Sequence, residues 1–216
     1  MTNVDPRLLA GWLAARSIAR ALPAPVPDRG GLRVDSGLPD ESRRHVFAGP
    51  DPGITELALE INEPKVFIKM CGPREQLLSR VTPRWHPHPD AYLMTKPPGI
   101  NPVPSLPPGY WLKVVAEAAE AALTSARIFT ENDQLVASGY AVEHEGLFVF
   151  DRISVDVLHR QQGLGAALMA ALGTAQQSRA AQRVLVATGM GRALYATLGW
   201  QVLSPYATVA LTPPTE

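Results

Sequence analysis

The strongest pattern of apolar positions in the chain is helical and begins at Gly163. Apolar residues stand at positions 164, 167, 168, 171, 172 and 175, the spacing that one buried face of an α-helix requires. This pattern predicts a helix from Gly163 to about Ser178. The segments before it alternate between apolar and polar positions, as half-buried strands do. They predict strands at 111–116, 123–130, 134–143 and 147–155, with a turn at 144–146.

Shorter elements are predicted on both sides of this block. Downstream, we expect a strand at 183–188, a helix at 192–198 that ends at Gly199, and a last strand at 206–211. Upstream, Asp5 and Pro6 indicate a helix start, because aspartate caps a first turn and proline fits its first position. The first half is further expected to contain strands at 32–35, 65–71 and 91–95 and helices at 40–47, 54–61 and 74–80.

Proline marks the organisation of the chain. Of the 21 prolines, 18 lie within residues 1–108, and six of these fall in 97–108. A segment so rich in proline runs extended and forms no regular element. We therefore expect an N-terminal α/β region at 1–96, a linker or flap at 97–108, and a C-terminal domain at 109–216. A plain connector is the favoured interpretation of the middle segment, and a flap over a site is the alternative.

Composition and charge exclude several classes of protein. The chain has 216 residues, of which 46% are hydrophobic, so it is long and apolar enough for a packed core. Its formal net charge is zero and no basic stripe is visible, which argues against a nucleic-acid partner. No apolar run approaches eighteen residues, and the first residues lack the basic and apolar regions of a signal peptide. We expect a soluble, cytoplasmic protein without a membrane partner.

Cysteine and histidine give little support to metal or disulfide chemistry. The one cysteine, Cys71, excludes an internal disulfide framework and a cysteine-based zinc site. Because it ends an apolar strand, a buried and inert thiol is expected rather than a nucleophile. His86 and His88 have no third ligand at suitable spacing, so a surface loop is expected there and no metal.

The segment most typical of a binding site joins the strand at 147–155 to the helix that starts at Gly163. Gly163 and Gly165 let the backbone approach a ligand closely, and the N–H groups and dipole of a helix start favour an anion such as pyrophosphate. Arg160 adds a full positive charge. A dinucleotide fingerprint would need a third glycine where Leu168 stands and an acidic residue near Thr188, and both are missing. No P-loop and no nucleophile elbow occur either.

Two motifs in order resemble the GNAT acyltransferase superfamily. The first is Arg160-x-x-Gly163-x-Gly165, and the second, about thirty residues later, is Ala193-Leu-Tyr195-x-x-Leu-Gly199-Trp200. The resemblance covers about residues 110–211. It implies an α/β (α+β) fold with a mixed, mostly antiparallel central sheet flanked by helices. The first half is then interpreted either as a degenerate GNAT-like unit or as the source of two helices that the second half lacks.

The resemblance also implies a role for each matching residue. Ile153, Ser154 and Val155 would pair with the amides of pantetheine, and Tyr195 would protonate or hydrogen-bond the departing thiolate. The N–H groups that would face the pyrophosphate, with Arg160 assisting, belong to Gln161, Gln162, Gly163, Leu164, Gly165 and Ala166. Thr188 and Gly191 stand where the family often has asparagine and alanine, and Thr188 can still donate one hydrogen bond. A packing role is the alternative for Tyr195.

We therefore expect an acetyl-CoA-dependent N-acetyltransferase in which an amine acceptor attacks the thioester directly, with acetyl-CoA as co-substrate. The alternative is a non-catalytic acyl-CoA-binding module. An amine is protonated at neutral pH and must lose a proton before it attacks. The candidate bases are Asp151, Glu143, Glu145 and bound water. The sequence identifies neither the acceptor nor the role of residues 1–96, and a homodimer is left open.

Overall fold

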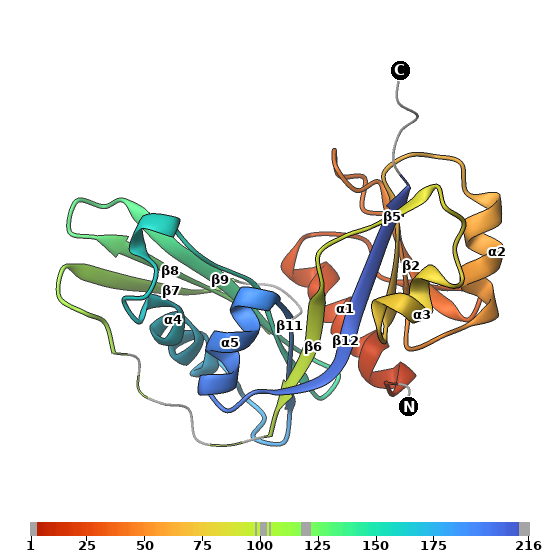
Figure 1. The fold of residues 1–216 in the computed structure, drawn as a ribbon. Helices are drawn as coiled ribbons and strands as arrows, with labels where there is room; N and C mark the ends of the chain where they lie inside the picture. Colours follow the sequence, from red (N-terminus) through yellow and green to blue (C-terminus); the bar gives the residue numbers. More distant parts are fainter. Residues whose placement is uncertain (1–3, 98, 100–102, 104, 118–121, 212–216) are drawn as a thin grey trace. The chain divides into compact units, whose positions relative to one another are not determined.

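A computed structural model describes residues 4–97, 99, 103, 105–117 and 122–211 of the chain (Figure 1). The chain forms two compact units. The first unit consists of Met1–Met94, Val186–Arg192 and Val202–Glu216, and the second unit consists of Thr95–Leu185 and Ala193–Gln201. The sequence-based division at 96/97 and 108/109 stays a prediction. Of the segment 97–108, residues 98, 100–102 and 104 lie outside the described residues.

The second unit is built on an antiparallel meander followed by a parallel crossover. Its strands are β7 (Tyr110–Glu117), β8 (Ala122–Thr130), β9 (Leu135–His144) and β10 (Leu147–Val155), and β11 (Gln182–Thr188) then pairs parallel to β10. The first four residues of β11 belong to this unit. The predicted strands are confirmed here. Glu145 and Gly146 both have positive φ (47° and 76°), which forms the tight turn predicted between β9 and β10.

Helix α4 (Leu164–Gly173) covers one face of this meander, and a glycine in β9 makes the close contact possible. A Cβ atom on Gly139 would lie 2.4 Å from Ile153 Cδ1 and 3.2 Å from Leu172 Cδ1. The helix is buried over nearly its whole circumference, and it ends five residues before the predicted Ser178. At this end the Thr174 hydroxyl donates to the carbonyl of Ala171 at 2.7 Å, a side-chain bond that competes with continuation of the helix.

The first unit also contains a parallel crossover with antiparallel neighbours. The strand order is β1 (Val26–Asp28), β2 (Gly31–Val34), β3 (Arg43–Phe47), β4 (Val66–Cys71), β12 (Gln201–Leu211) and β6 (Ala91–Lys96), and β5 (Trp85–Pro87) pairs with β12. Its helices are α1 (Pro6–Ala19), α2 (Pro52–Glu60) and α3 (Arg74–Leu78). A core forms where α2 and α3 pack on the sheet around Ile54, Leu57, Ile68, Leu77 and Val209.

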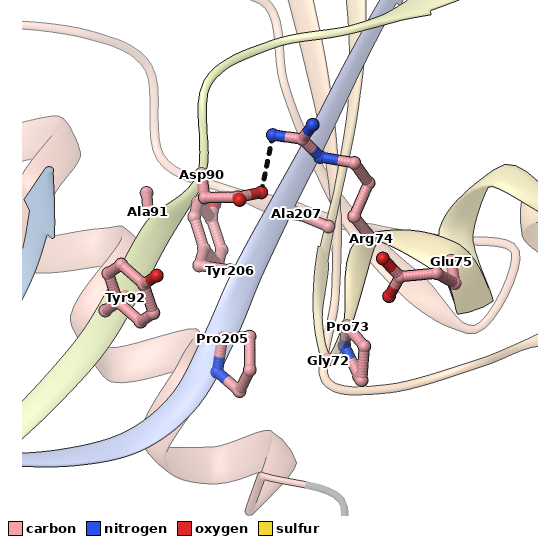
Figure 2. A pocket seen from close by; sticks show the side chains of 10 residues that line it. All are labelled: Gly72, Pro73, Arg74, Glu75, Asp90, Ala91, Tyr92, Pro205, Tyr206 and Ala207. Atoms are coloured by element: carbon pink, nitrogen blue, oxygen red, sulfur yellow. Dashed lines mark ion pairs between the residues drawn. The ribbon is translucent and has the colours of Figure 1, made fainter. Parts of the chain in front are cut away.

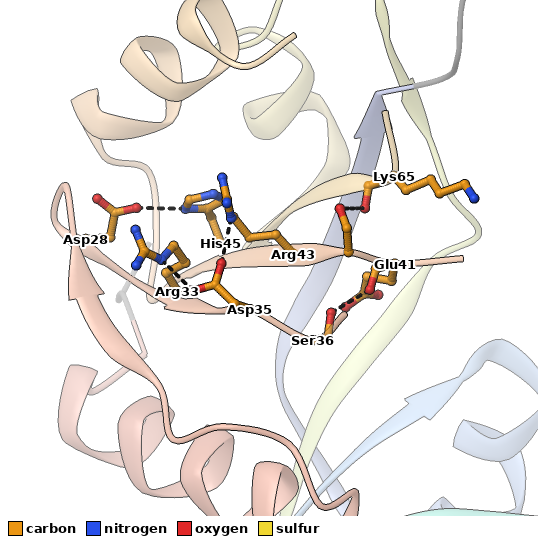
Figure 3. Close-up of polar contacts among 9 residues, drawn as sticks. Asp28, Arg33, Asp35, Ser36, Glu41, Arg43, His45 and Lys65 are labelled. Carbon is orange, nitrogen blue, oxygen red and sulfur yellow. Dashed lines mark hydrogen bonds and ion pairs between the residues drawn. The ribbon is translucent and has the colours of Figure 1, made fainter. Parts of the chain in front are cut away.

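One predicted element of the first unit is wrong. Residues 40–47 were expected to be helical, but Arg43–Phe47 form β3, which pairs antiparallel with β2 and parallel with β4. Arg44 pairs with Glu41 three residues earlier, but Arg43 and His45 contact carboxylates outside the segment, just after β2 and in β1. Arg43 Nε lies 2.7 Å from Asp35 Oδ1, and His45 Nδ1 lies 3.1 Å from Asp28 Oδ2 (Figure 3). Strand pairing on both sides therefore overrides the local helical preference.

Smaller differences concern short strands and exposed histidines. Neither β1 nor β5 was predicted. His86 lies in β5 rather than in a loop, although both His86 and His88 are exposed as expected. The prediction for Cys71 is confirmed, because its side chain is buried and burial raises the pKa of the thiol to about 12.

Candidate functional site

The site predicted from the sequence lies where β10 loses its parallel neighbour. β10 pairs in parallel with β11 at Leu147–Val149, opposite Gln182–Val184, and these are the β10–β11 pairs among the described residues. Beyond Val149 the recorded pairs of β10 are with β9. The end of β10, which includes Ile153, Ser154 and Val155, therefore has backbone groups on one edge that no β11 residue satisfies. An extended ligand with amide groups can pair with such an edge.

A bulge turns the end of β10. The register with β9 shifts between Asp151 and Ser154, and Arg152 has a positive φ of 54°. After the bulge Ser154 stands opposite Ser138, and its side chain is exposed. Ile153 is half-buried and its Cδ1 atom reaches the α4 face near Gly139. The bulge thus separates an inward side chain from an exposed one at the strand end.

The loop after β10 leaves the start of α4 open. Gln161 and Gly163 have positive φ values of 62° and 80°, and Gly163 is the N-cap residue of α4 without a side-chain capping bond. A Cβ atom on Gly163 would have no atom within 4 Å. The start of α4 therefore has no side-chain cap and has open space beside Gly163, which suits an anion. Leu164 and Gly165 are buried, whereas Gln161, Gln162 and Gly163 are exposed and Ala166 is half-buried.

Side chains from the loop and from β7 hold this loop in place. The Tyr110 hydroxyl donates to Gln162 Oε1 at 2.8 Å and lies 2.9 Å from His159 Nδ1. Arg160 Nε donates to the Val155 carbonyl at 3.1 Å, which keeps its guanidinium beside the strand end. Sequence reasoning missed Tyr110 and His159. They are 49 residues apart in the chain, and no local pattern connects them.

Helix α5 (Gly189–Thr197) carries the predicted tyrosine and starts three residues earlier than expected. The Tyr195 side chain is only 7% exposed, and burial raises its pKa to about 12. Its ring centroid lies 6.2 Å from that of Trp200, which in turn packs edge-on against Phe150 of β10 at 5.5 Å. A Cβ atom on Gly165 would meet Leu194 Cδ2 at 2.9 Å. The second unit therefore packs the Tyr195 segment against both β10 and the start of α4.

Thr188 takes a local role at the end of β11. It is exposed, and its Oγ1 atom accepts a hydrogen bond from the Gly191 N–H at 3.2 Å. This contact caps the first turn of α5. The hydroxyl proton is not used in that bond, so the expected donation to a ligand is compatible with the cap.

The candidate bases differ in their surroundings. Both carboxylate oxygens of Glu143 accept backbone N–H groups, from Gln177 at 2.6 Å and from Ser178 at 2.8 Å. These bonds hold the segment after α4, at Gln177 and Ser178, against β9, and they give Glu143 a structural role. Glu145 lies in the β9–β10 turn with a side chain that is 70% exposed. Asp151 is the candidate on β10 itself, directly before the bulge.

A cavity of ≈ 200 Å³ lies in the first unit and includes none of the predicted site residues (Figure 2). Arg74 lies at its rim, with Nη2 2.6 Å from Asp90 Oδ1 and donating to the His88 carbonyl at 3.0 Å. The lining residues are Gly72, Pro73, Arg74, Glu75, Asp90, Ala91, Tyr92, Pro205, Tyr206 and Ala207. Both signs of charge are present, and the arginine is already paired.

In the described part of the chain, no group of three or more histidine, cysteine, aspartate or glutamate side chains could hold a metal ion. Among the same residues, no helix is both long and apolar enough to cross a membrane.

The comparisons with known proteins identify the fold. No protein-family profile matches the sequence, and no curated protein matches it either. Among solved structures, a GCN5-related N-acetyltransferase from Kribbella flavida is 16% identical, with a TM-score of 0.65, and the match covers 100% of this chain and 98% of that one. An acetyltransferase of the GNAT family from Novosphingobium aromaticivorans is also 16% identical, with a TM-score of 0.57 and coverage of 98% and 100%.

A tandem GNAT protein from the clavulanic acid biosynthesis pathway is 13% identical, with a TM-score of 0.52, and the match covers 74% of this chain and 68% of that one. The mixed sheet, the open start of α4 and the first two matches, which are full-length, agree with the motifs in the sequence. The chain therefore has the fold of the GNAT superfamily.

Proposed function

We propose that this protein is an acetyl-CoA-dependent N-acetyltransferase in which an amine acceptor attacks the thioester directly. The observation that carries the proposal is the uncapped, open start of α4 beside the unpaired end of β10. The first feature suits a pyrophosphate and the second suits the amides of pantetheine. Both stand in the second unit, in a chain whose solved structural neighbours include GNAT acetyltransferases.

The cofactor-binding roles are assigned to named residues. The β10 segment that includes Ile153, Ser154 and Val155 offers backbone groups to pantetheine. The loop that includes Gly163 and Gly165 offers N–H groups, and Arg160 adds a positive charge whose position its bond to the Val155 carbonyl restricts. Gln161, Gln162, Leu164 and Ala166 contribute through their backbone, and Thr188 contributes through its hydroxyl.

Tyr195 is proposed to stabilise the leaving thiolate by a hydrogen bond. Its pKa of about 12 lies above that of a thiol, about 8.5, so complete proton transfer from the tyrosine would be unfavourable by about 5 kcal/mol. A hydrogen bond to the developing negative charge carries no such cost, and burial of the ring strengthens it. The tyrosine therefore acts as a donor that keeps its proton.

The acceptor must lose a proton to the remaining base candidates or to water. Glu143 is engaged by two backbone N–H groups, which lowers its value as a base. Asp151 on β10, Glu145 and bound water stay as candidates. The acetyl group passes to the amine nitrogen, the C–S bond breaks, and the thiolate takes up a proton as free CoA.

The alternative is a module that binds acyl-CoA without catalysis. Calorimetric titration with acetyl-CoA, CoA and NAD tests the cofactor, and thiol release over a panel of amines tests the reaction. The proposal expects binding of both CoA compounds but not of NAD, together with amine-dependent thiol release. Binding without release from any amine would favour the alternative. Absence of CoA binding would contradict both.

A further inference from the structure

The face of the second unit's sheet that points away from α4 carries an unusual row of side chains. Gly139 of β9 faces α4, and its partners across the sheet, Ala126 on β8 and Val114 on β7, share that face. Side chains alternate along strands, so the residues one position away point to the opposite face. These are Lys113, Arg127 and Ser138, which stand directly opposite one another on β7, β8 and β9.

The row continues to the proposed site. Ser138 stands opposite Ser154, the exposed residue after the bulge of β10. One line across four strands thus reads lysine, arginine, serine, serine. Strands lie about 4.8 Å apart, which places the Arg127 backbone about 10 Å from that of Ser154, within reach of an extended arginine side chain and a small acceptor.

Two cations directly opposite each other destabilise a sheet unless a third group compensates for them. Lys113 and Arg127 are both exposed, and the described residues offer neither of them an ion pair. The nearest acidic side chains on this face are otherwise engaged or one row further along. Glu117 Oε1 accepts from the Ser125 hydroxyl at 3.2 Å, and Asp151 stands opposite Tyr140.

Aromatic rings border the row on both sides. Trp111 stacks on Phe129 with centroids 4.4 Å apart, and Trp111 keeps 40% of its surface exposed. On the other side, the Arg152 guanidinium lies 4.4 Å above the Tyr140 ring, which adds a third cation to this face. Apolar walls beside a cation pair lower the local dielectric constant and strengthen its attraction for an anion.

We propose that Lys113 and Arg127 bind a carboxylate of the acceptor, so that the substrate is an amine that also carries an acid group. The inference rests on the proposed acetyltransferase function and adds a substrate class to it. Arginine suits this task because its planar guanidinium matches a carboxylate through two parallel hydrogen bonds. The serine hydroxyls of the row provide further donors on the side of Ser154.

Protection of an edge strand is the competing explanation for Lys113. β7 ends the strand order, and a lysine on an edge discourages pairing with other chains. This explanation does not cover Arg127, which lies on β8 between two neighbours. The two explanations also differ in their consequences for turnover.

The test compares ω-amino acids of increasing chain length with their amides, which have the same amine but no charge. The proposal expects kcat/KM to be about tenfold higher for the best acid than for its amide. In Arg127→Gln the acid should lose about tenfold in kcat/KM, mostly through KM, while the amide keeps its value. Arg127→Lys should retain part of the preference. Arg179→Gln, which removes an exposed cation outside the row, is the control and should change neither.

A binding experiment keeps the test independent of turnover. Backbone amide signals of β7 and β8 are followed by NMR during titration with 6-aminohexanoate and, separately, with its amide. Shifts at Lys113 and Arg127 with the acid alone support the proposal even if no acetyl transfer is found. Equal response to acid and amide, or equal loss of both in Arg127→Gln, would overturn it. If the unmodified protein does not bind acetyl-CoA, that result contradicts the proposed function rather than this inference.

Discussion

The chain contains two crossovers of the same kind, β3–α2–β4 in the first unit and β10–α4–β11 in the second, and they differ in how far their strands pair. All five residues of β3 pair with β4, from Arg43 opposite Val66 to Phe47 opposite Met70. Only three of the nine residues of β10 pair with β11. A crossover with complete pairing leaves no backbone groups for a ligand, whereas early separation of the strands exposes them.

The turns that lead into α2 and α4 also differ, because the first is closed by its own side chains and the second is open. In the first unit, the Asp51 side chain caps the Gly53 N–H at 2.8 Å, and Pro52 removes a further donor. The β1–β2 turn fills the remaining space, because a Cβ on Gly30 would lie 2.6 Å from Asp51 Oδ1. In the second unit, Gly163 has no capping side chain and faces open space. The turn before α2 thus places the Asp51 carboxylate at the helix start, whereas the turn before α4 leaves the corresponding position open to an anion from a ligand.

A crossover alone therefore does not make a binding site. The separation of the strands and the open helix start must occur together, and only the second unit has both. The interpretation of the first half as a degenerate GNAT-like unit stays a prediction. In the first unit, Asp51 and Pro52 close the start of α2.

The largest effect is expected at the second residue of each helix, which is glycine in both crossovers. In Gly53→Ala the new Cβ would lie 1.9 Å from the Arg29 carbonyl oxygen, a backbone atom that cannot move alone. We expect at least about 3 kcal/mol of lost stability. In Gly165→Ala the contact is the mobile Leu194 Cδ2 at 2.9 Å, so the loss should stay below about 1 kcal/mol. Urea denaturation measures the free energy of unfolding of each variant. Equal losses in the two variants would contradict the view that the start of α2 is closed and that of α4 is open.

The next effect concerns catalysis in the open crossover. Tyr195→Phe keeps the packing of the ring against Trp200 but removes the hydroxyl. We expect kcat to fall by tens- to a few hundred-fold, about 2 to 3 kcal/mol, with acetyl-CoA affinity nearly unchanged. Steady-state kinetics and calorimetry on the same preparation check this. An unchanged kcat would show that Tyr195 only packs against its neighbours and takes no part in catalysis.

A smaller effect is expected from blocking the anion site. Gly163→Val places a branched side chain in the open space of the turn, and we expect about tenfold weaker acetyl-CoA binding, about 1.4 kcal/mol. The φ of 80° also strains the backbone by about 1–2 kcal/mol. Gly146→Val is the matched control, because Gly146 has a φ of 76° and open space in a turn away from the loop. If both variants bind acetyl-CoA equally, the site assignment is wrong.

The open crossover could be predicted from the sequence, whereas the closed one could not. The period of the apolar positions fixed the place of α4, and Gly163 with Gly165 marked its start because local chemistry demands glycine there. In β3 the deciding contacts are distant. Arg43 contacts Asp35 after β2, and His45 contacts Asp28 in β1, whereas Arg44 alone has its partner, Glu41, within the segment predicted as a helix.

The supporting residues of the site lie beyond sequence reasoning for the same reason. Tyr110 contacts His159 and Gln162 across about fifty residues, and no spacing rule connects them. Glu143 looked like a candidate base, and only the structure shows that its two oxygens are bonded to the backbone of Gln177 and Ser178. Local patterns therefore identify the groups that face a ligand, and long-range contacts decide what holds them.

The smallest effect separates the two units by their response to acid. Burial of His45 on β3 lowers its pKa to about 4, from 6.5 in an unfolded chain, so the neutral ring is favoured in the fold. Between these values the unfolded chain binds more protons, and stability therefore falls as the pH drops from 6.5 toward 4. We expect a loss of about 1 kcal/mol between pH 7.5 and pH 5.5. Hydrogen exchange should show weaker protection in β3 and β4 at the lower pH, while β9 and β10 keep theirs. Glutamine does not titrate, so His45→Gln should remove this difference in protection between the two pH values. If the difference persists in the variant, groups other than His45 cause the acid response.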